Sequence, residues 1–166
     1  MFFTKEQDGS YHLASEELIL REANKICYQQ LQPGKYISSS RDAESAITCK
    51  LSKKQNEVFV CLFMDNQHRI LAFKEMFQGT INKNTVYPRE VVKEALQLNA
   101  AAVIFAHNHP SGVSNPSDND IELTITLRNI LKVINVKVLD HLVIGESVVS
   151  FADSGLMADL ENKPGI

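Results

Sequence analysis

Short apolar runs and amphipathic stretches of helical spacing alternate along most of the chain. Continuous apolar runs bounded by turn-forming residues predict strands over residues 57–64, 69–77, 100–106, 136–144 and 147–151. Apolar residues at helical spacing predict helices over residues 15–32, 42–51, 87–98 and 116–134. The turn-forming sequence Asp65-Asn66-Gln67 joins the first two strands in a hairpin, which interrupts a pure strand–helix–strand repeat. We therefore predict an α/β protein with a mixed sheet and helices packed on its faces.

The ends of the chain are less regular than its middle. Residues 1–14 either pair as an edge strand or fray, and the tail after Ala152 is expected to be loosely ordered. Ser15 can cap the first helix, which should stop near Pro33-Gly34 and pack on the domain or on a partner. The helix over residues 116–134 is expected to bury one stripe of apolar side chains. That stripe consists of Leu123, Leu127, Ile130, Leu131 and Ile134.

Composition places the chain among ordinary globular proteins. Its 166 residues, 44% apolar and 22% charged, favour one domain with at most a small extension. Three cysteines without a Cys-x-x-Cys spacing indicate a reducing cytoplasm, and no secretory signal or membrane-spanning run is evident. The net charge of −3 argues against a large nucleic-acid footprint. Lys50, Lys53 and Lys54 cluster before a strand, which is more typical of a solvated surface than of a phosphate site.

The stretch from His107 to Asp120 carries the candidate chemistry. Residues i and i+2 of an extended segment point the same way, so His107 and His109 can aim at one point while Asn108 points away. The intervening loop is long enough to bring Asp120 back toward them. Three protein ligands leave a fourth position of a zinc ion for water, and zinc lowers the pKa of that water to about 7. The sequence therefore predicts a catalytic zinc site of His107, His109 and Asp120.

Each part of this stretch also has a structural interpretation. Ser117-x-x-Asp120 fits a helix capping box, the commonest reason for such a pair at a helix start. A lone His-x-His is a weak signal. The combination of both with two prolines and a glycine, directly after an apolar strand, is hard to explain by capping alone. The two interpretations of Ser117 are compatible, because its backbone can start the helix while its hydroxyl faces a metal.

These residues resemble a known family motif. His-x-His-Pro, six residues and Ser-x-x-Asp resemble the motif of the JAMM (JAB/MPN+) metalloproteases, and His107-Asn108-His109-Pro110-Ser111-Gly112 is similar to the RadC family among them. Further matching stretches begin at Gln78, Tyr87, Leu98 and Leu139, and the resemblance covers roughly residues 40–155. It implies the JAMM fold, a cytidine-deaminase-like α/β/α architecture. We expect a helical extension over residues 1–40, a RadC-like JAMM/MPN domain over 41–155 and a loosely ordered tail over 156–166.

The resemblance also implies roles for two more residues. Glu57 stands directly before an apolar strand, where JAMM enzymes have a glutamate that acts as general base and then general acid. The residues alone would not prefer Glu57 over Glu75 or Glu90. The Ser117 hydroxyl would bind the developing oxyanion or the water. The leading hypothesis is a cytoplasmic zinc metallopeptidase that cleaves a peptide or isopeptide bond in a peptide or protein substrate.

A second hypothesis is an accessory protein in DNA repair or recombination with a metal site but no peptidase activity. Against direct nucleic-acid binding stand the negative charge and the expected absence of the helix-hairpin-helix module of longer RadC proteins. Iron could also use two histidines and one carboxylate, whereas a zinc deaminase would need cysteines near the motif. Asp140 and His141 lie inside an apolar strand, either as a satisfied structural pair, which we favour, or as orienting partners of a metal ligand. The oligomeric state is left open.

Overall fold

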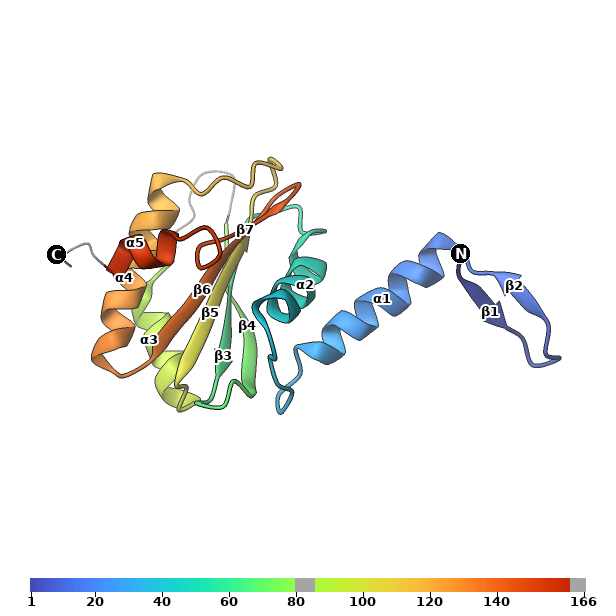
Figure 1. Cartoon of the computed structure of the whole chain (residues 1–166), viewed down its shortest axis with the longest axis horizontal. Helices are drawn as coiled ribbons and strands as arrows, with labels where there is room; N and C mark the ends of the chain where they lie inside the picture. The colour runs from blue at the N-terminus through green and yellow to red at the C-terminus, as the bar shows by residue number, and fades with distance from the viewer. Residues whose placement is uncertain (80–85, 162–166) are drawn as a thin grey trace.

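A computed structural model describes residues 1–79 and 86–161 of the chain. Twelve elements follow one another in this part, shown in Figure 1. They are β1 (Phe3–Lys5), β2 (Tyr11–Leu13), α1 (Glu16–Gln30), α2 (Ser40–Leu51), β3 (Val58–Met64), β4 (Ile70–Gln78), α3 (Pro88–Gln97), β5 (Ala102–Asn108), α4 (Asp118–Val133), β6 (Lys137–Ile144), β7 (Val148–Ser150) and α5 (Leu156–Glu161). None of these helices is both long enough and apolar enough to cross a bilayer.

The centre of the molecule is a five-stranded sheet in the order β4-β3-β5-β6-β7. The pairs β4/β3, β3/β5 and β6/β7 are antiparallel, whereas β5 and β6 run parallel. The predicted mixed sheet is therefore confirmed, including the hairpin of β3 and β4. In the register of the sheet, Phe59 on β3 lies opposite His107 on β5.

Helices cover both faces of this sheet, with α2 on one side and α3 and α4 on the other (Figure 1). Successive residues of β3 alternate between the two layers: Val58, Val60, Leu62 and Met64 pack with α2, and Phe59, Cys61 and Phe63 pack with α3 and α4. All seven are buried. A strand covered on both faces reads as a continuous apolar run, which is why the pattern of this strand lacks alternation.

The contact face of α4 differs from the predicted stripe at one position. Ile130 is 37% exposed, and the buried side chains of the helix are Thr124, Leu127 and Leu131. Those three follow the helical spacing of three and four residues, and Thr124 among them was not part of the predicted apolar stripe. The prediction for Ile130 was wrong because an apolar side chain one position from the contact line turns about 100° away from it.

The two ends of the described chain also refine the predictions. Residues 1–14 pair with each other as the hairpin β1-β2 rather than with the central sheet. The predicted capped helix is confirmed as α1, which contacts α2 and extends away from the sheet without burying a side chain (Figure 1). Part of the expected loose tail is the helix α5, whose Leu156 and Met157 pack against Phe151. Residues 162–166 of that predicted tail lie outside the described residues.

Candidate metal centre

Two histidines meet at the carboxyl end of β5. The extended backbone turns His107 and His109 to the same side, and their Nε2 atoms lie 2.9 Å apart. The Nδ1 atom of His109 donates to the backbone oxygen of Val113 at 2.6 Å, because a carbonyl oxygen can only accept. The Nε2 atom of His109 is therefore the ring nitrogen directed toward His107.

The loop after the histidines is held against the turn between β6 and β7. The amide of His109 donates to the oxygen of Ile144 at 2.8 Å, and the amide of Glu146 donates to the oxygen of Gly112 at 2.8 Å. Gly145 permits this approach, since a Cβ there would collide with the backbone oxygen of Gly112. These contacts fix the start of the path that leads from His109 to α4.

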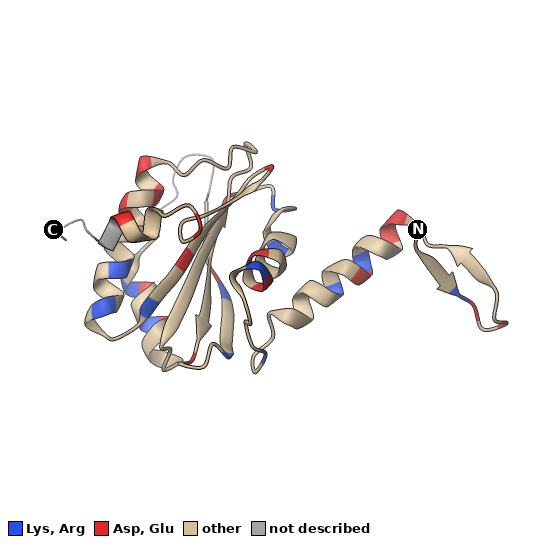
Figure 2. Ribbon diagram, viewed as in Figure 1, with Lys and Arg blue, Asp and Glu red and all other residues tan. Residues whose placement is uncertain are grey.

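The first turn of α4 brings Asp120 to the histidines. Asp118 and Asp120 give this helix start an acidic character (Figure 2), which suits the positive end of its dipole. Ser117 is the N-cap: its Oγ accepts from the amide of Asp120 at 3.2 Å, and both its amide and its hydroxyl donate to Asp120 Oδ2 at 2.7 Å. The capping box is therefore present, and the same carboxylate also faces His107, whose Nε2 lies 3.1 Å from Oδ1.

Several groups act on the charge of Asp120. Burial of the carboxyl raises its pKa, but the hydrogen bond and the charge of His107, with the hydrogen bonds from Ser117, outweigh burial and hold the pKa well below its ordinary value. The carboxylate is thus ionised throughout the neutral range. An ionised carboxylate beside two imidazole nitrogens is a donor set that suits a divalent transition metal.

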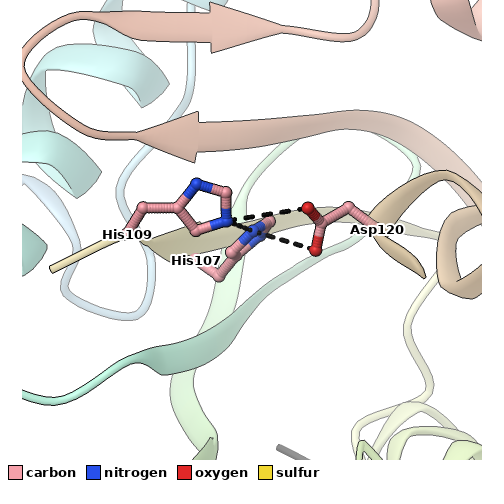
Figure 3. A group of neighbouring side chains, drawn as sticks. All are labelled: His107, His109 and Asp120. Carbon is pink, nitrogen blue, oxygen red and sulfur yellow. Dashed lines mark hydrogen bonds and ion pairs between the residues drawn. The ribbon is translucent and has the colours of Figure 1, made fainter. Parts of the chain in front are cut away.

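The geometry of the three side chains fits one metal ion. In Figure 3, both imidazoles and the carboxylate point toward a common centre, and their candidate donor atoms all lie within 4.8 Å of one another. The separations are 2.9 Å between the histidine Nε2 atoms, 3.1 Å from His107 to Oδ1 and 3.6 Å from His109 to Oδ2. Tetrahedral zinc with bonds of about 2.0–2.1 Å separates its donors by about 3.4 Å. Small shifts of these side chains would therefore accommodate the ion.

The triad opens into a cleft of about 710 Å³. Glu57 and Ser117 line the same cleft, so the structure brings all five residues that the sequence singled out to one place. Glu75 instead forms an ion pair with Lys54, and Glu90 lies beside Arg89. The rest of the wall combines the polar side chains of Gln78 and Asn119 with apolar and aromatic ones. The latter are Phe59, Phe77, Val86, Tyr87 and Leu123.

Asn108 is a site residue whose partners the sequence did not reveal. As predicted, its side chain points away from the histidines. Its Oδ1 accepts from the amide of Val58 at 2.9 Å, and its Nδ2 donates to the oxygens of Lys54 at 3.2 Å and Asn56 at 3.1 Å. The three contacts bracket Glu57 and tie it to the strand that carries the histidines. The one feature of the sequence that could have drawn attention to Asn108 is its position between the candidate ligands His107 and His109.

Asp140 and His141 have separate roles. Asp140 accepts from the amides of His141 and Ala152 and from the Ser150 hydroxyl, in agreement with the structural interpretation. His141 differs from that interpretation, because its Nε2 lies 2.9 Å from Nδ1 of His107. Burial, followed by the charge of His107, lowers the pKa of His141 well below its ordinary value, so its ring is neutral.

Comparisons with known proteins identify relatives of this chain. A family profile described as the RadC-like JAB domain matches residues 37–156. A UPF0758 protein of Vibrio cholerae is 48% identical over 142 residues, which cover 86% of this chain and 90% of that protein. UPF0758 proteins of Thioalkalivibrio sulfidiphilus and Methylibium petroleiphilum are 45% and 49% identical, and the matched regions cover 67% and 63% of their lengths. The chain belongs to the RadC-like JAB domain family.

Proposed function

We propose that this protein is a zinc-dependent metallohydrolase that cleaves an amide bond of a peptide or an isopeptide. The observation that carries the proposal is the meeting of His107, His109 and Asp120 in a cleft that Glu57 and Ser117 also line. Three ligand side chains facing a cleft match the ligand number of catalytic zinc sites, which keep one position open. The resemblance to JAMM peptidases supplies the reaction class.

His107 and His109 would hold the ion through Nε2, and Asp120 would hold it through its carboxylate. A zinc ion bound there supplies an acidified water and a positive charge that polarises a carbonyl group. The lowered pKa of Asp120 keeps this ligand ionised. The hydrogen bonds from Ser117 to Oδ2 hold the carboxylate in place before an ion arrives.

Glu57 and Ser117 would move protons and stabilise charge. Glu57 accepts a proton from the attacking water and returns it to the leaving amine, so the residue ends the cycle unchanged. Ser117 turns its hydroxyl from Asp120 Oδ2 toward the substrate oxygen as negative charge develops there. Phe59, Phe77 and Tyr87 on the wall give the substrate an apolar surface beside the reacting bond.

The experiment measures metal content and hydrolysis on the same preparations. Wild type should hold about one zinc per chain. Asp120→Ala should lose it, and Asp120→Asn should lose most of it while keeping an oxygen for the capping contacts. Glu57→Gln should keep the zinc and lose at least about 100-fold in the rate of cleavage in a peptide and isopeptide library.

The outcomes separate the proposal from its alternatives. Wild type without bound metal contradicts the site. Bound iron in place of zinc contradicts both the assignment of zinc and the proposed hydrolase activity. Bound zinc with no cleavage in the library, but with binding to DNA or to repair proteins, contradicts the hydrolase and favours the accessory role that the RadC resemblance also implies.

A further inference from the structure

A buried chain of polar contacts runs behind the candidate metal centre. Nδ1 of His107 lies 2.9 Å from Nε2 of His141, and Nδ1 of His141 lies 2.6 Å from Oγ1 of Thr124. The same Thr124 hydroxyl donates to the backbone oxygen of Asp120 at 2.6 Å. His141 and Thr124 are fully buried, and His107 is 2% exposed. The chain therefore begins and ends at two of the three candidate ligands without passing through water.

The number of protons in this chain determines the tautomer of each ring. Thr124 has one hydroxyl proton, and the oxygen of Asp120 can only accept, so that proton lies toward Asp120. The Thr124 oxygen then accepts from Nδ1–H of His141. The His141 ring is fully buried among three phenylalanine rings, so it carries a single proton, which is on Nδ1, and its bare Nε2 accepts from Nδ1–H of His107. When His107 gives its Nδ1–H to His141, the form of His107 that can bind a metal is the one with no proton on Nε2, the atom that faces Asp120 and His109.

We propose that His141 is a positioning residue that, held by Thr124, fixes His107 in the Nδ1–H tautomer required for binding a metal through Nε2. This inference rests on the metal site of the proposed function and extends it to two residues outside the ligand set. Metal-bound histidines usually donate their other N–H to a carboxylate, a carbonyl or a water. Here a second, neutral imidazole takes that place.

Packing alone does not account for a histidine at this position. Phe59, Phe105 and Phe151 surround the ring of His141, with centroid distances of 5.7, 5.9 and 4.9 Å. An apolar side chain would suit these neighbours. A histidine there loses the hydration of two ring nitrogens, and the contacts to His107 and Thr124 compensate for that loss. The inference therefore predicts that hydrogen bonding, and not ring volume, determines the effect of a substitution.

The test compares zinc affinity across matched variants of the full chain, measured by competition with a chromophoric chelator. In His141→Gln, the amide can accept from His107 and donate to Thr124, whereas His141→Leu can do neither. Loss of such a partner typically weakens metal binding by about 10–100-fold, and we expect that loss in His141→Leu and less than about a fivefold loss in His141→Gln. Thr124→Val should also weaken zinc binding, and Thr124→Ser should restore it.

A spectroscopic measurement checks the tautomers directly. Long-range ¹H–¹⁵N spectra of the zinc-loaded protein should show His141 protonated at Nδ1 and bare at Nε2, and His107 protonated at Nδ1. Thermal unfolding of the metal-free variants shows which of them remain folded. His141 protonated at Nε2, or equal zinc affinity in folded His141→Leu and wild type, would overturn the inference while leaving the metal site intact. Wild type that binds no zinc would overturn both.

Discussion

Asn108 joins the two parts of the candidate site that are far apart in sequence. The histidines follow β5, whereas Glu57 precedes β3, and the Asn108 side chain bonds to the backbone on both sides of Glu57. Its contact with the Val58 amide is buried. A buried amide that loses its partner costs about 1–3 kcal/mol, so Asn108 contributes to stability as well as to the position of Glu57.

Asn108→Ala should therefore separate metal binding from hydrolysis. We expect the free energy of unfolding to fall by about 1–3 kcal/mol, because the Val58 amide and two carbonyl oxygens lose their partners. Zinc content should stay near that of wild type, since Asn108 points away from His107 and His109. The cleavage rate should fall at least about tenfold, because Glu57 is no longer held. Denaturant unfolding, elemental analysis and a cleavage assay measure the three quantities.

Asn108→Asp is the matched control. It keeps an oxygen for the Val58 amide but turns a carboxylate toward the carbonyl oxygens of Lys54 and Asn56, so it should not restore hydrolysis. Loss of zinc in Asn108→Ala would show instead that Asn108 acts on the histidines.

The sequence indicated the three candidate ligands, but not the contacts that support them. The two-residue spacing of His107 and His109 follows from strand geometry, and a capping box brings Asp120 to the start of a helix. The partners of Asn108 lie 50 to 54 residues away, and His141 is 34 residues from His107. No local pattern encodes such distances, because they depend on strand order and register. Local spacing therefore could not show that His141 contacts His107.

At the level of elements, the candidate site depends on the contact between the loop after β5 and the turn after β6. The amide of Glu146 bonds to Gly112, and the Ser114 hydroxyl donates to the oxygen of Ser147 at 2.9 Å and accepts from its amide at 3.1 Å. A Cβ on Gly145 would lie 2.8 Å from Ser114 Oγ and still closer to the oxygen of Gly112. The loop can approach this turn only because residue 145 has no side chain.

Gly145→Ala should therefore weaken metal binding without touching a ligand. The added methyl group pushes the loop away, and overpacking of this kind typically costs about 1–3 kcal/mol of stability. His109 moves with the loop, so we expect zinc affinity to fall by about tenfold or more. Calorimetric unfolding of the metal-free protein and chelator competition measure the two effects.

Gly9→Ala is a suitable comparison, because Gly9 has a φ of +85° but open space around its Cβ position. It introduces backbone strain in the β1-β2 turn and should leave zinc affinity unchanged. Unchanged affinity in Gly145→Ala would show that the loop position does not determine the geometry of the ligands.

The types of the main elements followed from apolar periodicity, and the exceptions have physical causes. Strands β3 and β5 are buried on both faces, so continuous apolar runs marked them clearly. The buried face of α4 includes the polar residue Thr124, which contacts Asp120 of the same helix and His141 of β6, and apolar periodicity assigned the exposed Ile130 to this face in error. Helix α5 is short, and its contacts with Phe151 are tertiary, so local pattern alone did not predict it.

On the scale of the whole molecule, the packed body begins at Leu31. None of residues 1–30 is buried, whereas Leu31 is 3% exposed and belongs to the core on the α2 side. Just after it, the amide of Gly34 bonds to the oxygen of Ile70, and the amide of Ile70 bonds to the oxygen of Lys35. A two-stranded hairpin and a single 15-residue helix are marginally stable by themselves, so β1, β2 and α1 add little to the stability of the body.

Removal of residues 2–30 should thus change the free energy of unfolding of the remaining chain by about 1 kcal/mol or less. Leu31→Ala in the full chain should cost about 2–5 kcal/mol, because it leaves a cavity between α2 and the sheet. The truncated chain should also keep wild-type zinc affinity, since none of the three ligands contacts the removed residues. Denaturant unfolding and chelator competition on both variants test this division. A large loss of stability on truncation, with a small loss in Leu31→Ala, would mean that β1, β2 and α1 are part of the cooperative unit.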